Sequence, residues 1–198
     1  MLTPKEIELF GKFLPNPFAE RTAKDVASKS ASYTERALKR LEAEGVIKKN
    51  LVGNVRTYTC IINDISVAYL TIAGRNKLSH QAKLALDILL QAIPKDAAVL
   101  VFGSHAKNAT RPESDLDIYV ITPEPEQVKR IIADATNKII IPIDAHVFTK
   151  EDTAEMLRRP EQNLAKEIVV GNLPTRNAIL FYSLVALTRY APPRTRRH

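Results

Sequence analysis

The chain has 198 residues, which is enough for one ordinary domain or two small ones. Apolar residues make up 45% and charged residues 26%, a composition that excludes a disordered chain. The formal net charge of +7 favours a polyanionic partner. One cysteine excludes an internal disulfide, and no signal pattern or bilayer-length apolar stretch is present. We therefore expect a cytoplasmic protein with no membrane partner.

Three capping boxes predict three helices near the N-terminus. Thr3-Pro4-Lys5-Glu6 begins the first helix, which ends before Pro15. Thr22-Ala23-Lys24-Asp25 begins a short second helix. Ser32-Tyr33-Thr34-Glu35 begins a third helix, which runs to residue 44 and is ended by Gly45.

Residues 46–52 and 55–62 are predicted strands, joined by Gly53-Asn54, a two-residue hairpin signal. Three helices followed by a hairpin resemble a winged helix-turn-helix domain, here residues 1–64. The resemblance implies that the third helix enters the major groove of double-stranded DNA while the hairpin meets phosphates. The alternative is a winged helix that contacts only proteins. The residues expected to contact DNA are Ser32, Tyr33, Thr34, Arg36, Lys39, Arg40, Lys48, Lys49 and Arg56.

Residues 65–95 are predicted to form a helical linker, broken near Gly74 and Asn76, with Ser79 capping its second helix. Apolar residues recur along it at helical spacing. This stripe is either a dimer seam, as in helix-turn-helix proteins that bind half-sites, or a surface that packs on the chain's own two domains. We expect a homodimer.

Residues 97–120 carry the most informative pattern. An apolar run at residues 99–102 predicts a strand buried on both faces, ended by Gly103 and Ser104. In the following strand Asp115 and Asp117 share a face, because side chains alternate along a strand. Two such carboxylates repel unless a cation lies between them, and hard oxygen ligands suit Mg²⁺. Gly103 permits close backbone approach and Ser104 offers donors, which predicts a phosphate-facing turn.

A third carboxylate fits the same site. Residues 124–138 have helical spacing, and residues 139–148 are strand-like, with Asp144 and His146 on one face. A strand–helix–strand crossover tends to place its two strands side by side, so Asp144 is expected next to Asp115 and Asp117. We expect His146 to form a hydrogen bond near the site rather than bind a metal.

The Gly-Ser turn, the Asp-x-Asp strand and the later Asp resemble the DNA polymerase beta-like nucleotidyltransferase superfamily. They look most like its minimal branch, often found in prokaryotic toxin–antitoxin pairs. The resemblance implies an α+β chain in which residues 96–190 form a small mixed-sheet nucleotidyltransferase domain. It implies that Asp115 and Asp117 bind Mg²⁺ (or Mn²⁺), and that Asp144 activates the attacking hydroxyl or shares a second metal. Gly103 and Ser104 would hold the triphosphate.

The turn departs from the family, which often reads Gly-Ser-x-Ala-Arg-Gly. Lys107 stands at the arginine position and keeps the charge but not the fork geometry, and Asn108 replaces a glycine. We include Lys107 among the nucleotide-binding residues. Helices are predicted at residues 150–159, 161–170 and 175–190. A basic tail, residues 191–198, either contacts a nucleic-acid backbone or only adds solubility.

The resemblance implies transfer of a nucleoside monophosphate from a nucleoside triphosphate, with ATP expected, to a protein, RNA or other nucleic-acid hydroxyl. DNA binding by the winged helix would locate or regulate the reaction. Two other functions stay open. The first is a DNA-binding transcription regulator that senses a nucleotide without turnover, and the second is an antitoxin-like protein that neutralises a partner by binding.

Overall fold

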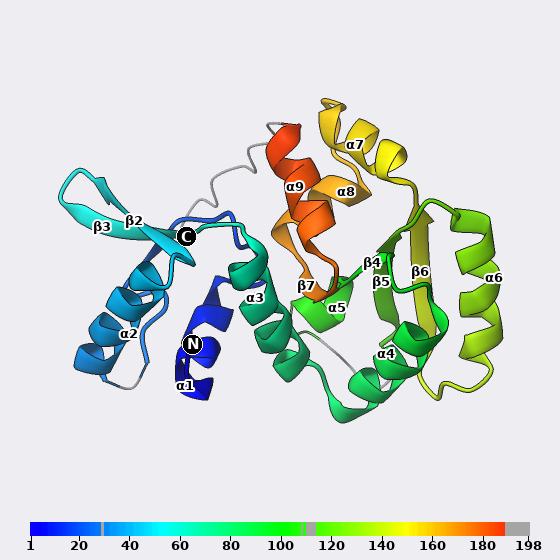
Figure 1. The fold of residues 1–198 in the computed structure, drawn as a ribbon, viewed down its shortest axis with the longest axis horizontal. Helices are drawn as coiled ribbons and strands as arrows, with labels where there is room; N and C mark the ends of the chain where they lie inside the picture. The colour runs from blue at the N-terminus through cyan, green and yellow to red at the C-terminus, as the bar shows by residue number, and fades with distance from the viewer. Residues whose placement is uncertain (29, 108, 110–113, 189–198) are drawn as a thin grey trace.

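A computed structural model describes residues 1–28, 30–107, 109 and 114–188 (Figure 1). The predicted basic tail, Asn108 and Tyr190 lie outside these residues. The helices are α1 (Pro4–Phe10), the 3-10 helix η1 (Gly11–Phe13), α2 (Ala31–Ala43), α3 (Asp64–Lys77), α4 (His80–Ala92), α5 (Gly103–Ala106), α6 (Pro125–Thr136), α7 (Lys150–Arg158), α8 (Leu164–Val170) and α9 (Ile179–Leu187). The strands are β1 (Arg21–Thr22), β2 (Ile47–Val52), β3 (Val55–Cys60), β4 (Ala98–Val101), β5 (Leu116–Ile121), β6 (Ile143–Phe148) and β7 (Leu173–Arg176).

The first helix starts as predicted. The Thr3 hydroxyl accepts a hydrogen bond from the Glu6 backbone N–H, and the Glu6 carboxylate accepts one from Thr3. The predicted second helix is wrong. The bonds of a capping box form between Thr22 and Asp25, but they close only a turn. Thr22 is held in β1, which pairs with β3, so tertiary pairing overrides the local signal.

The third predicted helix, α2, starts two residues early. Its N-cap is Ser30, whose hydroxyl accepts a hydrogen bond from the Tyr33 backbone N–H. The hairpin is confirmed, with Val52 opposite Val55 across the Gly53-Asn54 turn. The N-terminal part therefore holds α1, α2 and a three-stranded sheet in the order β1-β3-β2.

The predicted linker consists of α3 and α4, and Ser79 caps α4 as expected. The break falls at Leu78 and Ser79; Gly74 lies inside α3, packed against Leu173 and Pro174. The apolar stripe is buried within this chain, where Leu70, Leu86 and Leu89 are fully covered. This matches the alternative of packing on the chain's own two parts. Figure 1 shows α3 between the N-terminal helices and the larger sheet.

The larger sheet has four strands in the order β6-β5-β4-β7. The central strand β4 is buried along its whole length and is antiparallel to both β5 and β7. β5 and β6 are parallel, so the predicted crossover through α6 is confirmed. Helices α4 and α6 cover one face of the sheet, and α7, α8 and α9 cover the other (Figure 1).

Two predicted boundaries near the C-terminal end need correction. The strand expected at residues 139–148 begins only at Ile143. The helix expected at residues 175–190 begins at Ile179, because Leu173–Arg176 forms β7 against β4. The Thr175 hydroxyl fixes this pairing by donating to the Val99 carbonyl over 2.7 Å. Among the described residues, no helix is both long and apolar enough to cross a membrane.

Candidate functional site: an acidic strand pair facing a glycine turn

Two of the predicted acids stand on adjacent strands. In the parallel register of β5 and β6, Asp117 is the direct partner of Asp144. Asp115 lies just before β5 and is exposed. The alternation is as predicted, because Leu116 and Ile118 are fully buried in the core on the opposite face of the sheet. All three carboxylates therefore gather at one end of the sheet.

The glycine turn closes directly onto Asp117. Gly103 has φ +64°, and a Cβ placed there would lie 1.9 Å from Asp117 Oδ2. The Ser104 backbone N–H donates to the Asp117 carboxylate. The Phe102 N–H donates to the Asp117 carbonyl over 3.0 Å. The turn thus lies directly against the acid.

The surroundings of Asp117 disfavour the negative charge of its carboxylate. Burial raises the pKa of its carboxyl, and the charges of Asp144 and Asp115 raise the pKa further. The hydrogen bond from Ser104 and the proximity of His105 oppose this rise. A carboxylate that is disfavoured in this way is stabilised when a cation binds beside it.

The raised pKa predicts how stability depends on pH. The folded protein holds the Asp117 proton more tightly than the unfolded chain, whose ordinary value is 3.8. Stability from this group is therefore lost as pH rises from 3.8 through the higher folded value. In the presence of a chelator, the urea midpoint of Asp117→Asn should match that of wild type at about pH 3 and exceed it at about pH 7. If the urea midpoint of Asp117→Asn exceeded that of wild type by the same amount at both pH values, the raised pKa of Asp117 would be contradicted.

Asp144 lies on the exposed side of the pair. Its Oδ2 is 3.3 Å from His146 Nε2, and both side chains are accessible to solvent. The expected hydrogen bond of His146 is therefore present. The His146 ring also contacts Phe102, which directly follows β4, with ring centroids 5.6 Å apart.

The three acids do not form a ready-made metal cage. Within the part of the chain that the structure describes, no group of three or more His, Cys, Asp or Glu side chains is arranged to hold a metal ion. Repulsion between unscreened carboxylates opposes such convergence. A Mg²⁺ ion typically takes one or two carboxylates and completes its shell with water and phosphate oxygens. The neighbouring pair Asp117 and Asp144, with Asp115 beside it, fits that smaller requirement.

Lys107 contacts a residue that the sequence did not point to. Its Nζ lies 3.1 Å from Glu167 Oε1 on α8, and both side chains are about half exposed. The expected nucleotide-binding cation is therefore ion-paired in this state. His105, on the same turn, is buried and interacts with the Ser114 backbone. Burial lowers the pKa of this histidine.

Two of the residues predicted to contact DNA are instead engaged or buried within the protein. Thr34 is buried, and its hydroxyl donates to the Ser30 carbonyl and accepts from the Ser28 N–H, so it leaves the set. The Tyr33 hydroxyl is buried as well. The other α2 positions, Ser32, Arg36, Lys39 and Arg40, are exposed.

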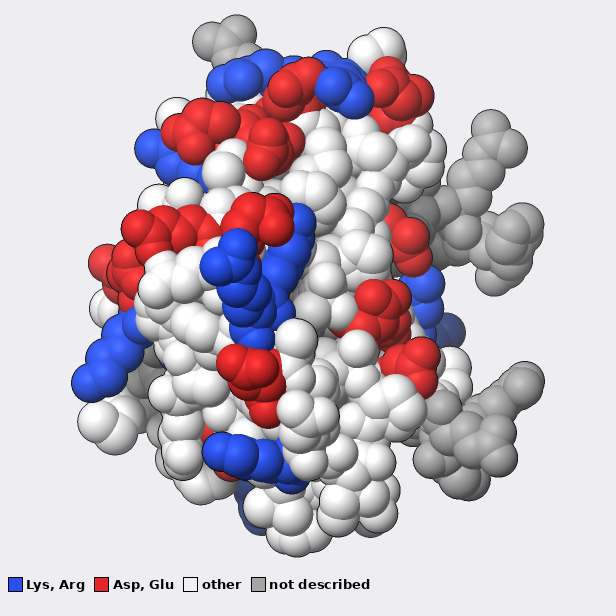
Figure 2. All heavy atoms as spheres, turned by 90° about the vertical axis from the view of Figure 1, so that its right-hand side faces the viewer, with Lys and Arg blue, Asp and Glu red and all other residues white. Residues whose placement is uncertain are grey.

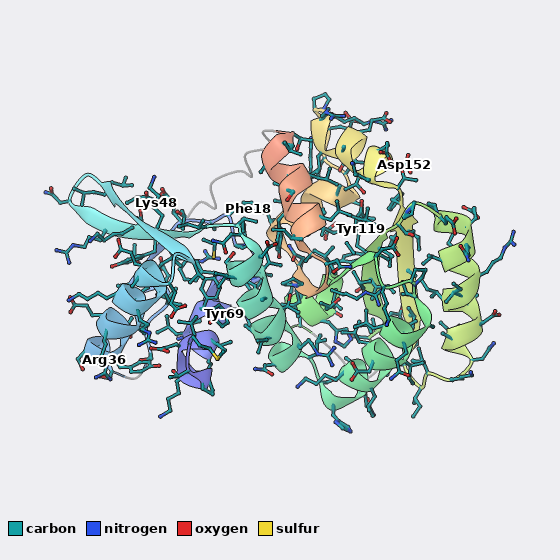
Figure 3. The ribbon with its side chains drawn as sticks, viewed as in Figure 1. Phe18, Arg36, Lys48, Tyr69, Tyr119 and Asp152 are labelled. Atoms are coloured by element: carbon teal, nitrogen blue, oxygen red, sulfur yellow. The ribbon has the colours of Figure 1, made fainter. Side chains whose placement is uncertain are left out.

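The hairpin cations divide between two faces. Lys49 and Arg56 share one face with Ile47 and Tyr58, whereas Lys48 points to the other. Ile47 and Tyr58 join the core that contains Leu38 and Leu41 of α2, so Lys49 and Arg56 lie on the α2 side. Arg21, which pairs with Tyr58, lies on the same face of the sheet. It was not predicted as a DNA contact because the sequence of β1 has no strand pattern. Figure 3 shows Arg36 and Lys48 across α3 from Tyr119 and Asp152.

The side of the molecule formed by α6 has mixed charge. Figure 2 shows acidic and basic side chains interspersed over it. On α6, Lys129 and Glu126 form an ion pair of 2.7 Å. The described residues of this side form no continuous positive surface, so the side does not suit a polyanion.

Comparison with known proteins agrees with the acidic site. Residues 82–170 match the family model of the nucleotidyltransferase domain, which supports such a domain and a general nucleotidyl-transfer function in this part of the chain. The match begins within α4 and ends at the last residue of α8, so it includes Gly103, Asp117 and Asp144. No curated protein and no solved structure matches the chain.

Proposed function

We propose that the chain is a Mg²⁺-dependent nucleotidyltransferase that moves a nucleoside monophosphate from a nucleoside triphosphate, ATP first among the candidates, to a hydroxyl of a protein or nucleic acid. The observation that carries the proposal is the contact between the Gly103 turn and Asp117, with Asp144 as its cross-strand neighbour. The domain match over residues 82–170 supports the same chemistry.

Each residue has a distinct role in this proposal. Asp117 and Asp115 would hold Mg²⁺ (or Mn²⁺), which would neutralise charge on the triphosphate. Asp144 would align the acceptor hydroxyl and take its proton, and pyrophosphate would leave from the α-phosphorus. The Ser104 hydroxyl and the Gly103 backbone would contact the distal phosphates. Lys107 would join them after separating from Glu167, an exchange of low cost because both partners are half exposed.

The test is transfer of label from α-labelled triphosphate to a protein or RNA acceptor co-purified with the full chain. The four nucleotides are compared, with Mg²⁺, with Mn²⁺ and with chelator. Label on the acceptor together with released pyrophosphate supports the proposal. Binding of nucleotide without either product would support the alternative, a nucleotide-responsive DNA-binding regulator.

We also propose that the N-terminal part is a winged helix that binds double-stranded DNA. The α2 side of the hairpin would face phosphates. Lys49→Ala and Arg56→Ala should each weaken DNA binding and lower the salt slope of log K by about one. Lys48→Ala is the matched control and should leave the slope unchanged. Equal slopes for all three variants, measured by fluorescence anisotropy, would contradict this orientation.

A further inference from the structure

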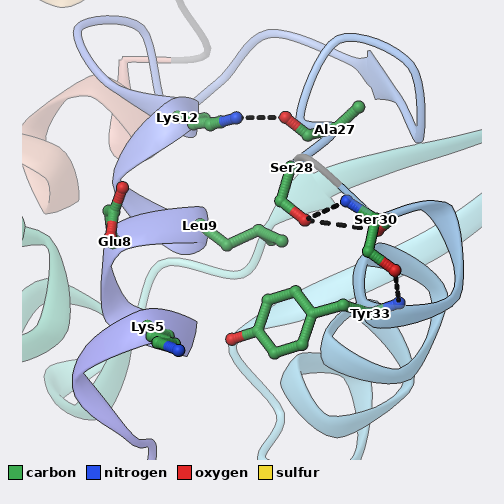
Figure 4. Close-up of a pocket in the computed structure, with 8 residues that line it drawn as sticks. All are labelled: Lys5, Glu8, Leu9, Lys12, Ala27, Ser28, Ser30 and Tyr33. Atoms are coloured by element: carbon green, nitrogen blue, oxygen red, sulfur yellow. Dashed lines mark hydrogen bonds between the residues drawn. The ribbon is translucent and has the colours of Figure 1, made fainter.

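A pocket lies far from the acids, between α1 and the start of α2. Its volume is about 610 Å³, within the usual range for small-molecule sites. Lys5, Leu9 and Lys12 line it from the α1 side, and Ser28, Ser30 and Tyr33 from the α2 side. Figure 4 shows the Tyr33 phenol reaching across toward α1, with its hydroxyl nearest Lys5 and Leu9 beside the ring.

Tyr33 brings an unused hydrogen-bonding group to this pocket. Its hydroxyl is buried and has no partner among the described residues. The serine hydroxyls are already engaged: Ser30 Oγ accepts from the Tyr33 N–H, and Ser28 Oγ donates to the Ser30 carbonyl. A buried hydroxyl without a partner is unfavourable, so a ligand that accepts its proton gains at this point.

The charges around the pocket favour an anion. Lys5 and Lys12 stand at spacing i, i+7 along α1 and η1, with one carboxylate, Glu8, between them. Lys12 Nζ donates to the Ala27 carbonyl, which ties the loop to α1 and leaves further donors on the ammonium. Arg36 lies over the Tyr33 ring, 5.7 Å from its centroid. Leu9 supplies an apolar floor.

We propose that this pocket binds a small organic anion. A carboxylate or phosphate oxygen would accept hydrogen bonds from the Tyr33 hydroxyl and the Lys5 ammonium, and the apolar body of the ligand would lie on Leu9. Ser30 and Tyr33 also form the N-cap contact of α2. A ligand in the pocket would therefore contact the residues that begin α2. An effect of the ligand on DNA affinity would rest on the proposed DNA binding, but binding of the ligand itself does not depend on that proposal.

The test uses three ligands that share one chain and differ in head group: hexanoate, hexyl phosphate and the uncharged 1-hexanol. Amide resonances of Leu9, Ser28, Ser30 and Tyr33 in the full chain should shift saturably with at least one anion and not with the alcohol. Comparing the two anions identifies the head group. Equal binding of the alcohol would show that the pocket does not select an anion, and no saturable shift at millimolar concentrations would show that the pocket binds none of these ligands. Either result would overturn the proposal.

Tyr33→Phe separates a ligand contact from a structural one. It removes only the unpartnered hydroxyl, so the urea midpoint should stay the same or rise, whereas anion binding should weaken by about tenfold or more. Lys5→Met should weaken anion binding as well. Lys24→Met, at an exposed lysine of the same region that does not line the pocket, is the matched control. A lower midpoint for Tyr33→Phe with unchanged binding would overturn the assignment.

Discussion

Asp117→Asn is expected to lower nucleotidyl transfer by about a thousand-fold. Metal-based stabilisation of phosphoryl charge contributes several kcal/mol, and each loss of about 1.4 kcal/mol slows a reaction tenfold. Asn keeps the size of the side chain and can still accept from the Ser104 amide. It also removes the charge that Asp144 and Asp115 oppose. The loss of rate should therefore come without a loss of stability, measured as label transfer and urea midpoint on the same preparation.

The matched control is Asp134→Asn on α6. Asp134 is exposed, and the change removes one carboxylate of the same type away from the sheet end. Its transfer rate should equal that of wild type. If Asp117→Asn retained activity within a few-fold, the acids would have no catalytic role, and the nucleotide-responsive alternative would also need a different site. If both variants lost activity equally, a general effect of net charge would be the explanation.

The local chemistry of the chain predicted those parts of the fold that depend on neighbours in sequence. Thr3 and Ser79 cap helices where the capping pattern indicated. The hairpin turns at Gly53-Asn54, and the crossover through α6 sets Asp144 beside Asp117. In each case the residues that interact are separated by no more than about thirty positions in the sequence, the length of a strand–helix–strand unit.

The missed elements depend on partners far along the chain. β1 exists because Arg21 and Thr22 pair with β3, and β7 exists because Leu173 pairs with Val101 of β4. Neither segment has a strong strand pattern of its own. The capping box at Thr22 formed its hydrogen bonds without a helix, so a local motif was satisfied while the tertiary structure decided the element.

The candidate site shows the same division. Which acids meet could be predicted, because strand alternation and the crossover rule fix their face and edge. The partners of the turn could not. Glu167 is sixty residues from Lys107 in sequence, and only the packing of α8 brings them together. The burial of His105 and its contact with the Ser114 backbone were likewise not indicated by any pattern in the sequence.

Gly103→Ala is expected to reduce transfer by about a hundred-fold and to destabilise the fold. Two costs add at this position. An alanine at positive φ costs about 1–2 kcal/mol, and its Cβ would lie 1.9 Å from Asp117 Oδ2 and 2.6 Å from Asp117 Cγ. The carboxylate or the turn must therefore move by roughly an ångström, a displacement that can cost about a hundred-fold in rate. Label transfer and urea denaturation are measured together.

Gly53→Ala isolates the backbone cost. Gly53 has a similar φ of +59°, but no atom of the described residues lies within 4 Å of a Cβ built there. This variant should lose only about 1–2 kcal/mol of stability and keep its full transfer rate. The difference between the two variants measures the contact between the turn and the acid. If they lost stability equally and both stayed active, Asp117 would have room to move without consequence. The turn would then only reverse the chain direction, and its contact with Asp117 would not position a catalytic carboxylate.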